Sequence, residues 1–521
     1  MTSQLFPPRL CAHNIQNPKR RTGIPRVSLA RALTCACLLG AVGSAIADTT
    51  PLVMLDPNLE VGVFVGGFSQ PIAMAFIGPD DFLVIEKASG LVKRVIGGVV
   101  QAAPVLDLAV NSNSERGLLS IALSPTFPTD PSIYLSWTES TTGGDTNVAL
   151  NTPTNGNRVD RFIWNGSALT IANNVDRVRS LQTDNTPVPG HPGSTNNAAQ
   201  GNHDGGVIRF GPDGKLYHFI GDVGRRGWMQ NLANGPFLTA PFVDDTFGGP
   251  MPDNAHLTGV ILRLNTDGTA PKDNPFFAAG MKMGGEVGAN IQKIYSYGHR
   301  NGFGMAFDPI SGHLWETENA DDAFSELNRV VPGMNGGWVQ LAGPLSRFAQ
   351  FKQIETTLFN NAIQQVRYPP TRIAYTAAVA RSRMLMLPGA VYKDPELSWL
   401  YEIGPSGTTF VMGDALGPEY NGTLWFGSAR GFAQVGGNGG SIYRLRLTAN
   451  RMDIDFSADP RLNDRVADNL FRTGKFDGTE SESMQIGKGF GIVPDLVQGP
   501  DGNLYAVSNT DNVIYRVRRR P

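Results

Sequence analysis

The sequence has almost no cysteine. All three cysteines of the 521-residue chain, Cys11, Cys35 and Cys37, lie within its first 37 residues. The chain that follows therefore has no disulfide, no thiolate metal site and no cysteine nucleophile. Charged residues are also scarce, at 17%. The longest apolar run near the start, residues 33–47, is too short to span a bilayer, so we expect no stable membrane insertion.

The first 47 residues lack acidic side chains altogether. Six basic residues precede the apolar run LTCACLLGAVGSAIA, which ends on Ala45-Ile46-Ala47. This pattern predicts a secretory signal peptide over residues 1–47 and hence a periplasmic or secreted protein. Without those six, 38 of the 44 basic residues face 46 acidic ones, so the formal charge becomes -8. An acidic chain of this kind argues against nucleic acid as a partner.

A short turn-and-strand signature recurs six times over residues 48–521. In each copy, proline presets φ and glycine, asparagine or aspartate completes a turn into an apolar strand, which is typical of β-hairpins. The copies are GPDDFLVI from position 78, SPTFPTDPSIYLSW from 124, GPDGKLYHFIGD from 211, DPISGHLWETE from 308, GPEYNGTLWFGS from 417 and GPDGNLYAVSN from 499.

The spacing of these copies, 46 to 109 residues, is too wide for a compact solenoid. It predicts an all-β fold over residues 48–521, a six-bladed β-propeller with long inserted loops. The alternative is two unrelated β domains that share common turn dipeptides. Residues 59–68, LEVGVFVGGF, are a candidate for the strand that closes the ring with the last blade, and the insert around 340–390 is expected to be partly helical.

Two polar loops carry the candidate chemistry. His203 lies among Gly, Asn and Asp just before a strand that ends at Asp222, and Arg300 and Asn301 follow His299 at the end of another strand. A guanidinium beside a carboxamide offers fixed donors to a developing oxyanion. Seen alone, the histidine also fits a solvated surface residue, and the Arg-Asn pair also fits a loop that caps backbone carbonyls. A propeller would bring both loops to one channel mouth.

Five segments taken together resemble the soluble PQQ-dependent sugar dehydrogenases, the glucose/sorbosone dehydrogenase family. They are ERGLLSIALSPTF, NHDGGVIRFGPDGKLYHFIGD, LTGVILRLNTDGTAPKDNPF, YGHRNGFGMAFDPISGHLWETE and ELNRVVPGMNGGW. The resemblance runs in order from about residue 60 to the C-terminus. It implies oxidation of an aldose at its anomeric carbon with hydride transfer to pyrroloquinoline quinone (PQQ), a sugar substrate and an unidentified electron acceptor.

The resemblance also implies residue roles. His203 would be the general base that removes the proton of the anomeric hydroxyl, and Asp222 would orient its ring and stabilise its protonated form. Arg300 and Asn301 would donate hydrogen bonds to the quinone oxygens as negative charge develops on them.

Four further positions follow from the same resemblance. Glu115 takes the place of a cofactor-contacting glutamine, and Trp399 matches an aromatic residue that stacks on the quinone. Ala320 and Asp321, in the acidic segment ENADDAFSELN, align with the backbone carbonyls that bind a Ca²⁺ bridging protein and cofactor. Carbonyl and carboxylate oxygens suit Ca²⁺, although a solvated acidic turn gives the same pattern.

The sequence departs from the family where the carboxylates of PQQ are gripped. Ala429 stands at the position of a lysine, with Arg430 next to it as a possible substitute. Ile492 and Pro494 replace two arginines, and only Asp495 of that motif is kept. Such charge-assisted contacts are worth about 1.5–3 kcal/mol each. Two alternatives therefore stay open, a calcium-dependent lactonase-like hydrolase that uses an activated water and a non-catalytic carbohydrate-binding propeller.

Overall fold

Strands dominate the part of the chain that the computed structural model describes. That part comprises residues 51–148, 156–178, 203–222, 257–320, 323–338, 340–357, 374–429, 440–468, 471–472, 475–476 and 480–521. It belongs to one compact unit, Cys37–Pro521. The predicted signal peptide, residues 1–47, lies outside the described residues, as do Asp321 and Arg430.

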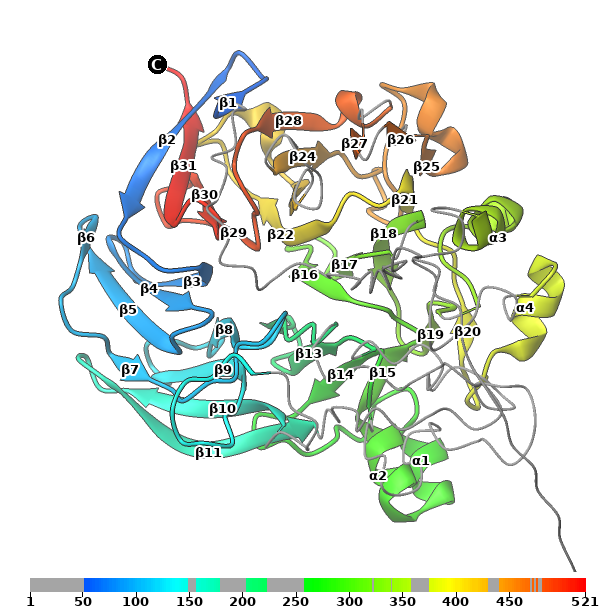
Figure 1. Cartoon of the computed structure of the whole chain (residues 1–521), viewed down its shortest axis with the longest axis horizontal. Helices are drawn as coiled ribbons and strands as arrows, with labels where there is room; N and C mark the ends of the chain where they lie inside the picture. The colour runs from blue at the N-terminus through cyan, green and yellow to red at the C-terminus, as the bar shows by residue number, and fades with distance from the viewer. Residues whose placement is uncertain are drawn as a thin grey trace, which may run out of the picture. The chain divides into compact units, whose positions relative to one another are not determined.

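Three sheets begin in the first half of the described chain (Figure 1). The first contains β3 (Pro71–Gly78), β4 (Asp81–Glu86), β5 (Leu91–Ile96), β6 (Val99–Val100) and β7 (Leu106–Asp107). The second contains β8 (Leu118–Leu123), β9 (Ser132–Thr138), β10 (Asn157–Trp164) and β11 (Leu169–Val178). The third contains β12 (Ile208–Phe210), β13 (Leu216–Ile220), β14 (Val260–Leu264), β15 (Ile294–Tyr297), β19 (Met334–Asn335) and β20 (Val391–Tyr392).

Three more sheets follow, and two of them take a strand from the beginning of the chain. The fourth contains β16 (Gly302–Phe307), β17 (Leu314–Glu318), β18 (Ala323–Val330), β21 (Leu397–Tyr401) and β25 (Val466–Ala467). The fifth contains β22 (Pro405–Val411), β23 (Thr423–Ser428), β24 (Ser441–Leu445), β28 (Gln485–Lys488) and β1 (Val53–Met54). The sixth contains β29 (Asp495–Gln498), β30 (Leu504–Ser508), β31 (Val513–Arg519) and β2 (Leu59–Gly66), while β26 (Phe471–Arg472) and β27 (Lys475–Phe476) pair separately.

The innermost strands of these sheets surround a common centre (Figure 1). Strands β3, β8, β12, β16, β22 and β29 each stand at one end of their sheet, and each contacts the next, with β29 contacting β3 to close the ring. Strand β2 pairs antiparallel with β31, so the segment 59–68 does join the last sheet, as predicted. The prediction of an all-β propeller is confirmed.

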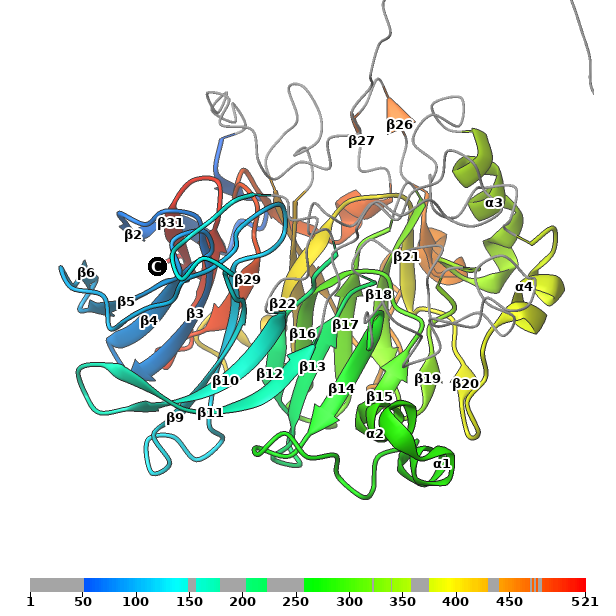
Figure 2. The same cartoon turned by 60° about the horizontal axis from the view of Figure 1, so that its bottom comes forward.

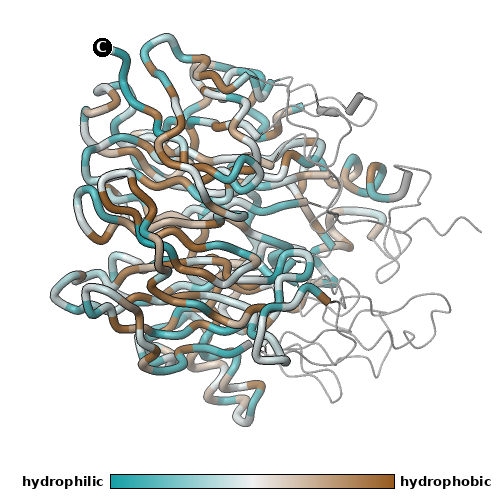
Figure 3. The backbone as a smooth tube through the Cα atoms, turned by 60° about the vertical axis from the view of Figure 1, so that its left-hand side comes forward, coloured by the Kyte–Doolittle hydropathy of each residue, from teal (hydrophilic) through white to brown (hydrophobic). Residues whose placement is uncertain are grey.

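Both faces of each sheet are buried, because neighbouring sheets pack face to face. On β4, Leu83 and Ile85 pack against the second sheet, whereas Phe82 and Val84 pack against the sixth. Successive side chains of a strand point to opposite faces, so such a strand reads as a nearly continuous apolar run. Clusters of the same kind lie between each pair of neighbouring sheets, and Figure 3 shows hydrophobic segments recurring along the backbone.

The turns that the sequence predicts form as tight hairpins. Between β12 and β13, the N–H of Gly214 donates to the carbonyl of Gly211 at 2.9 Å, and Gly214 has φ +69°. The equivalent bond between β29 and β30 joins Gly502, at φ +77°, to Gly499. A left-handed residue is what these turns require, which explains the glycine of each GPDG copy.

Helices lie only at the outer edge of the described sheets (Figures 1 and 2). They are α1 (Phe277–Met283), α2 (Gly285–Lys293), α3 (Phe348–Thr357) and α4 (Ala377–Arg383), with 3-10 turns at Leu345–Arg347, Pro418–Tyr420, Pro460–Asp464 and Ser481–Ser483. The insert around 340–390 is thus partly helical, as expected. Thr376 caps α4 by accepting a hydrogen bond from the N–H of Val379. No helix among the described residues has both the length and the apolar composition needed to cross a membrane.

Candidate active site

The predicted loops meet on the face of the ring where the inner strands begin. Glu115 shortly precedes β8, His203 precedes β12, and Arg300 and Asn301 directly precede β16. Asp222 follows β13, and because β13 runs antiparallel to β12, its end lies at the same face. The fold therefore brings together residues that the sequence separates by up to 186 positions.

Two of these loops touch each other at Gly221. The N–H of Asp222 donates to the carbonyl of Arg300 at 2.7 Å. A Cβ on Gly221 would lie 2.2 Å from the carbonyl oxygen of His203 and 2.9 Å from that of Arg300. Such distances are far below van der Waals contact, so a side chain at position 221 would force the two loops apart.

His203 is buried and hydrogen-bonded through both ring nitrogens. Its Nδ1 lies 2.5 Å from Oδ1 of Asp222, and its Nε2 lies 2.9 Å from Nη2 of Arg300. A guanidinium only donates hydrogen bonds, so Nε2 is the acceptor and Nδ1 carries the proton. The contacts thus select a neutral imidazole whose basic nitrogen, Nε2, faces the guanidinium.

Asp222 is fully buried and stays ionised. Oδ2 accepts a hydrogen bond from the indole Nε1 of Trp338 at 2.8 Å. Burial by itself raises the pKa of this carboxyl, but the electrostatic attraction and hydrogen bond of the His203 ring, the charge of Arg300 and the Trp338 bond together hold the pKa well below its ordinary value. A fixed anion at Nδ1 makes the imidazole a stronger base at Nε2. Trp338 ends the family segment ELNRVVPGMNGGW, but the sequence does not connect it with Asp222, which lies 116 positions away.

The Arg300 guanidinium is held in place by three groups. Besides His203, it donates from Nη1 to the carbonyl of Asn319 at 2.9 Å, and its carbon lies 5.6 Å from the centre of the Trp338 ring. The backbone N–H of Arg300 donates to Glu318. These contacts fix a positive charge beside the imidazole, which is the geometry needed to stabilise a developing anion.

Glu115 connects the two predicted loops. Its Oε2 accepts a hydrogen bond from the N–H of His203 at 2.7 Å and another from Nδ2 of Asn301 at 3.0 Å. Burial and the charge of Asp204 raise the pKa of Glu115 to about 7, against the opposing effect of these bonds. Glu115 therefore contacts the two polar loops directly, and its contact with a cofactor stays a prediction.

Three further buried charges lie beside Glu115, and none was singled out in the sequence. They are Lys87, Arg116 and Asp204, all less than 5% exposed. Burial lowers the pKa of Lys87 to about 8 although Glu115 and Asp204 favour its charged form. Burial also raises the pKa of Asp204 to about 6. The group alternates in sign, so its charges largely compensate one another.

The structure places Trp399 away from these loops. Its side chain is fully buried on β21, in the core between the fourth and fifth sheets. The ring meets Phe426 at 5.5 Å in an edge-to-face arrangement and Tyr443 at 6.4 Å. Trp399 and its neighbours Leu397 and Ser398 are all buried on β21. Trp399 is therefore a core residue that fills the space between the two sheets. In this structure the ring packs on protein, and quinone stacking by Trp399 has no support from its surroundings.

The positions of the expected carboxylate clamp carry no cation. Ala429 follows β23, and its N–H donates to the carbonyl of Gly404 at 2.8 Å. The N–H of Ile492 donates to Oγ1 of Thr510 at 3.0 Å, and Pro494 directly precedes β29. The backbone N–H groups of Ala429 and Ile492 therefore bond within the protein, and none of the three side chains is charged. Ala320, the described member of the predicted calcium pair, is 7% exposed.

Asp495, the one retained member of the clamp motif, has a different setting. Its Oδ1 lies 2.8 Å from Nη2 of Arg209, and its Oδ2 accepts the N–H of Met74 at 3.1 Å. Met74 lies on β3 and Arg209 on β12, and both are inner strands. The three residues help to line a cavity of about 610 Å³ bounded by the inner strands. Asp495 thus stabilises the centre of the ring.

Fold and site together define a class of protein. It is a β-propeller in which a neutral histidine base, backed by a buried carboxylate, lies against a fixed guanidinium. Such an arrangement is chemically able to accept a proton at Nε2 and to stabilise negative charge on a neighbouring atom.

The chain belongs to the Glucose / Sorbosone dehydrogenase family, whose pattern it matches over residues 68–394. That match includes Glu115, His203, Asp222, Arg300 and Asn301. The family is one of oxidoreductase enzymes, and the resemblance that the sequence motifs indicate is confirmed.

Similar proteins include characterised and uncharacterised members. The chain is 28% identical over 466 residues, 88% of its length and 85% of the other, to an uncharacterized protein of Synechocystis sp.. It is 29% identical over 291 residues to the quinoprotein glucose dehydrogenase B of Acinetobacter calcoaceticus, covering 55% of this chain and 53% of that protein. The PQQ-bound aldose sugar dehydrogenase of Streptomyces coelicolor has a similar fold, with TM-score 0.52 and 21% identity over 89% of this chain and 99% of that one.

Proposed function

We propose that the protein oxidises an aldose or a related sugar at the anomeric carbon, with PQQ as its cofactor. The observation that carries the proposal is the line Asp222–His203–Arg300, which holds a base and an anion-stabilising cation 2.9 Å apart. Family membership supports the same reaction class, and so does the 29% identity over 291 residues to a quinoprotein glucose dehydrogenase.

The base has to exchange partners before it acts. In the structure, the lone pair of His203 Nε2 accepts a hydrogen bond from Arg300. A sugar hydroxyl that approaches Nε2 replaces this bond, which frees Nη2 of Arg300 for a neighbouring oxygen. His203 then takes the hydroxyl proton and becomes an imidazolium, which Asp222 stabilises from the other side. PQQ, when bound, supplies the acceptor for the hydride that leaves the anomeric carbon.

The residues fit the quinone oxygens of PQQ, but the cations that the family resemblance implies for its carboxylates are missing from the expected positions. Arg300 and Asn301 offer donors for quinone oxygens, and the buried Oδ1 of Asn301 has no hydrogen-bond partner among the described residues, so it is available to a ligand donor. No cation stands at Ala429, Ile492 or Pro494. We therefore propose that Ca²⁺, held by the carbonyls of the segment at residues 320–321, provides the main counter-charge for the cofactor.

We also propose a location and a blade count. The basic, then apolar, first 47 residues support export to the periplasm or the medium. Six sheets of four or more strands, with an apolar cluster between each neighbouring pair in the described chain, support six blades. An external electron acceptor would reoxidise the cofactor in that compartment.

The test is a reaction of purified protein with aldoses in the presence of PQQ, Ca²⁺ and an artificial electron acceptor. We expect acceptor reduction that requires sugar, PQQ and protein together. The same preparations are assayed with sugar lactones without PQQ. Lactone hydrolysis that needs Ca²⁺ and no quinone would replace the dehydrogenase assignment with the hydrolase, a candidate that the absent clamp cations favour. Sugar binding without turnover of either kind would indicate a carbohydrate-binding propeller.

A further inference from the structure

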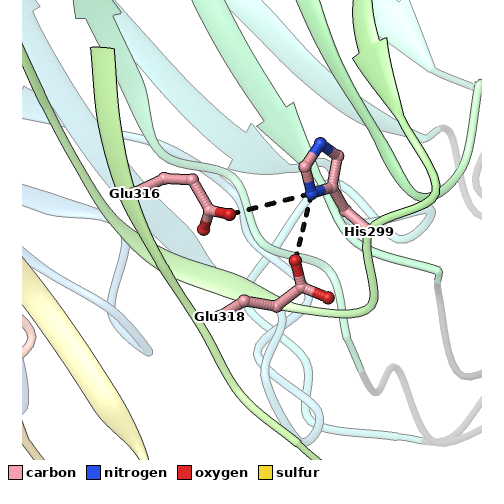
Figure 4. Close-up of side chains that lie close together, drawn as sticks. All are labelled: His299, Glu316 and Glu318. Carbon is pink, nitrogen blue, oxygen red and sulfur yellow. Dashed lines mark hydrogen bonds and ion pairs between the residues drawn. The ribbon is translucent and has the colours of Figure 1, made fainter. Parts of the chain in front are cut away.

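A buried cluster of one histidine and two glutamates (Figure 4) includes His299, the residue that precedes Arg300. Glu316 and Glu318 are alternate residues of β17, so both side chains project from the same face of the strand. His299 reaches them from the loop between β15 and β16. Its Nδ1 lies 3.0 Å from Oε2 of Glu318 and 3.7 Å from Oε1 of Glu316, and the three atoms all lie within 4.8 Å of one another.

The cluster carries more negative charge than its neighbours compensate. His299 and Glu316 are completely buried, and Glu318 is 6% exposed. Oε2 of Glu316 is buried and has no hydrogen-bond partner among the described residues. Glu326 lies close by and shares the amide of Asn328 with Glu316, at 2.9 and 2.8 Å. An unpaired carboxylate oxygen in such a place indicates a missing cation.

The spacing of the three atoms suits a small divalent ion. Zinc binds imidazole nitrogen at about 2.0–2.1 Å and carboxylate oxygen at about 2.0–2.2 Å, so two ligands of a tetrahedral ion lie roughly 3.3 Å apart. The observed separations, 3.0 and 3.7 Å, fall on either side of that value. Ca²⁺ fits less well, because it takes six to eight oxygen ligands at longer distances.

The outer contacts of the cluster also match metal ligation. Nε2 of His299 lies 2.9 Å from Oγ of Ser296. With Nδ1 on a metal, Nε2 carries the proton and donates it to this hydroxyl, which fixes the ring orientation. Glu318 keeps its second oxygen for the N–H of Arg300. A metal here would thus hold Glu318, and through it the Arg300 backbone, in position.

We propose that His299, Glu316 and Glu318 bind one first-row divalent transition-metal ion, zinc by preference, as a structural site next to Arg300. The site is separate from the calcium position expected at residues 320–321. The proposal does not rest on the sugar dehydrogenase activity, because zinc binding is measured without sugar or PQQ.

Elemental analysis of the full-length protein tests the proposal. The protein is stripped with a chelator, incubated with Zn²⁺ alone, and freed of loose ions by gel filtration. Zinc per chain and the melting temperature are then measured for wild type, Glu316→Gln and Glu326→Gln. Each variant removes one of the two buried carboxylates that share the Asn328 amide. Glu326 is not among the three proposed ligands, so Glu326→Gln controls for relief of charge repulsion.

We expect one zinc per chain in wild type and Glu326→Gln, with a higher melting temperature than the stripped protein. Glu316→Gln should bind zinc about a hundredfold more weakly or worse, since it loses a ligand. Equal retention in Glu316→Gln, or no retained zinc in wild type, would overturn the proposal. If the variants fail to fold, Co²⁺ titration of stripped wild type decides. The absorption bands of four-coordinate Co²⁺ would support the site, and their absence would refute it.

Discussion

His203 owes its proposed reactivity to two residues that lie 19 and 97 positions away in the chain. Asp222 fixes the proton on Nδ1, and Arg300 faces the basic Nε2. A histidine in a polar loop is ordinarily solvated and titrates near its reference pKa, which leaves its tautomer free to change. Burial between an anion and a cation removes that freedom and aims one lone pair at the substrate position.

Replacement of His203 tests this role directly. We expect His203→Ala to lower the turnover of aldose oxidation by roughly a hundredfold or more, because the variant loses the proton acceptor that Asp222 orients. The matched control is His313→Ala, since His313 lies in the turn between β16 and β17 and bonds to the carbonyl of Arg451. That variant should keep turnover within about twofold of wild type. Steady-state kinetics and circular dichroism on both variants make the measurement.

A His203→Ala enzyme that keeps turnover within a few-fold of wild type would remove the residue from the mechanism. Equal losses in both histidine variants would instead point to a general effect on the fold.

The raised pKa of Glu115 predicts a pH dependence of stability. Its folded-state pKa of about 7 exceeds its ordinary value of 4.5, so the folded protein holds this proton more tightly than the unfolded chain. The stabilisation is therefore complete below about pH 4.5 and is lost as pH rises through 7, at most roughly 3 kcal/mol. A protonated Oε1 leaves Oε2 to accept both of its hydrogen bonds.

Glutamine mimics the protonated form, so Glu115→Gln should remove this contribution. We expect the melting temperature of wild type to fall by a few degrees relative to the variant between pH 5 and pH 8. Thermal melts at several pH values measure it. Parallel curves for the two proteins would show that Glu115 is ionised throughout this range.

At the scale of elements, closure of the ring rests on β2. This strand comes from the beginning of the described chain and pairs with β31 near its end. Its side chains differ sharply in burial, since Val65 is 7% exposed and Val63 is 61% exposed. Val65 packs between the sixth and first sheets with Phe82. Ring closure therefore depends on this strand's packing as well as on its backbone hydrogen bonds.

The two valines provide a matched pair. Val65→Ala should destabilise the protein by about 1–3 kcal/mol, because it leaves a cavity at the seam of the ring. Val63→Ala, the same change on an exposed side chain of the same strand, should cost less than about 0.5 kcal/mol. Unfolding in denaturant measures both. Similar costs would mean that the seam is held by backbone pairing alone.

At the scale of the whole molecule, the site combines residues from several sheets. The positions expected to bind the carboxylates of PQQ differ from the family pattern. The base, the carboxylate and the guanidinium converge from the third and fourth sheets, whereas the clamp positions of the fifth and sixth sheets carry Ala429, Ile492 and Pro494. Loss of three charge-assisted contacts weakens a trianionic ligand by several powers of ten if nothing replaces them.

We therefore expect PQQ to bind more weakly than it would to a site with all three clamp cations. We also expect PQQ binding to depend strongly on Ca²⁺. Ala429→Lys should tighten PQQ binding by about tenfold or more, since it restores one charge-assisted contact. Titration of wild type and variant with PQQ, with and without Ca²⁺, measures both effects. Ala429→Gln serves as a neutral control of similar bulk.

Nanomolar PQQ binding by wild type without Ca²⁺ would contradict this account of the clamp. Equal effects of lysine and glutamine at position 429 would show that charge is not the cause.

Much of the architecture follows from local sequence. The Pro-Asp-Gly turns before β13 and β30 form because proline and glycine restrict the backbone there whatever surrounds them. Alternating or continuous apolar runs predict strands, and six copies of one signature predict a propeller. The shared motifs around His203 and Arg300 likewise identify the family from the sequence alone.

The tertiary structure decides what local pattern leaves undetermined. Trp399 matches an aromatic ligand in sequence, yet it fills the core between two sheets, because burial depends on which sheets face each other. The bond of Trp338 to Asp222, the bridge of Glu115 and the approach of Glu316 to His299 also join distant segments. Sequence by itself determined the turns, the strands and the base with its motif. Only the closed ring brings together the ends of strands far apart in the chain. It therefore decided the tautomer of that base and which buried charged residues surround it.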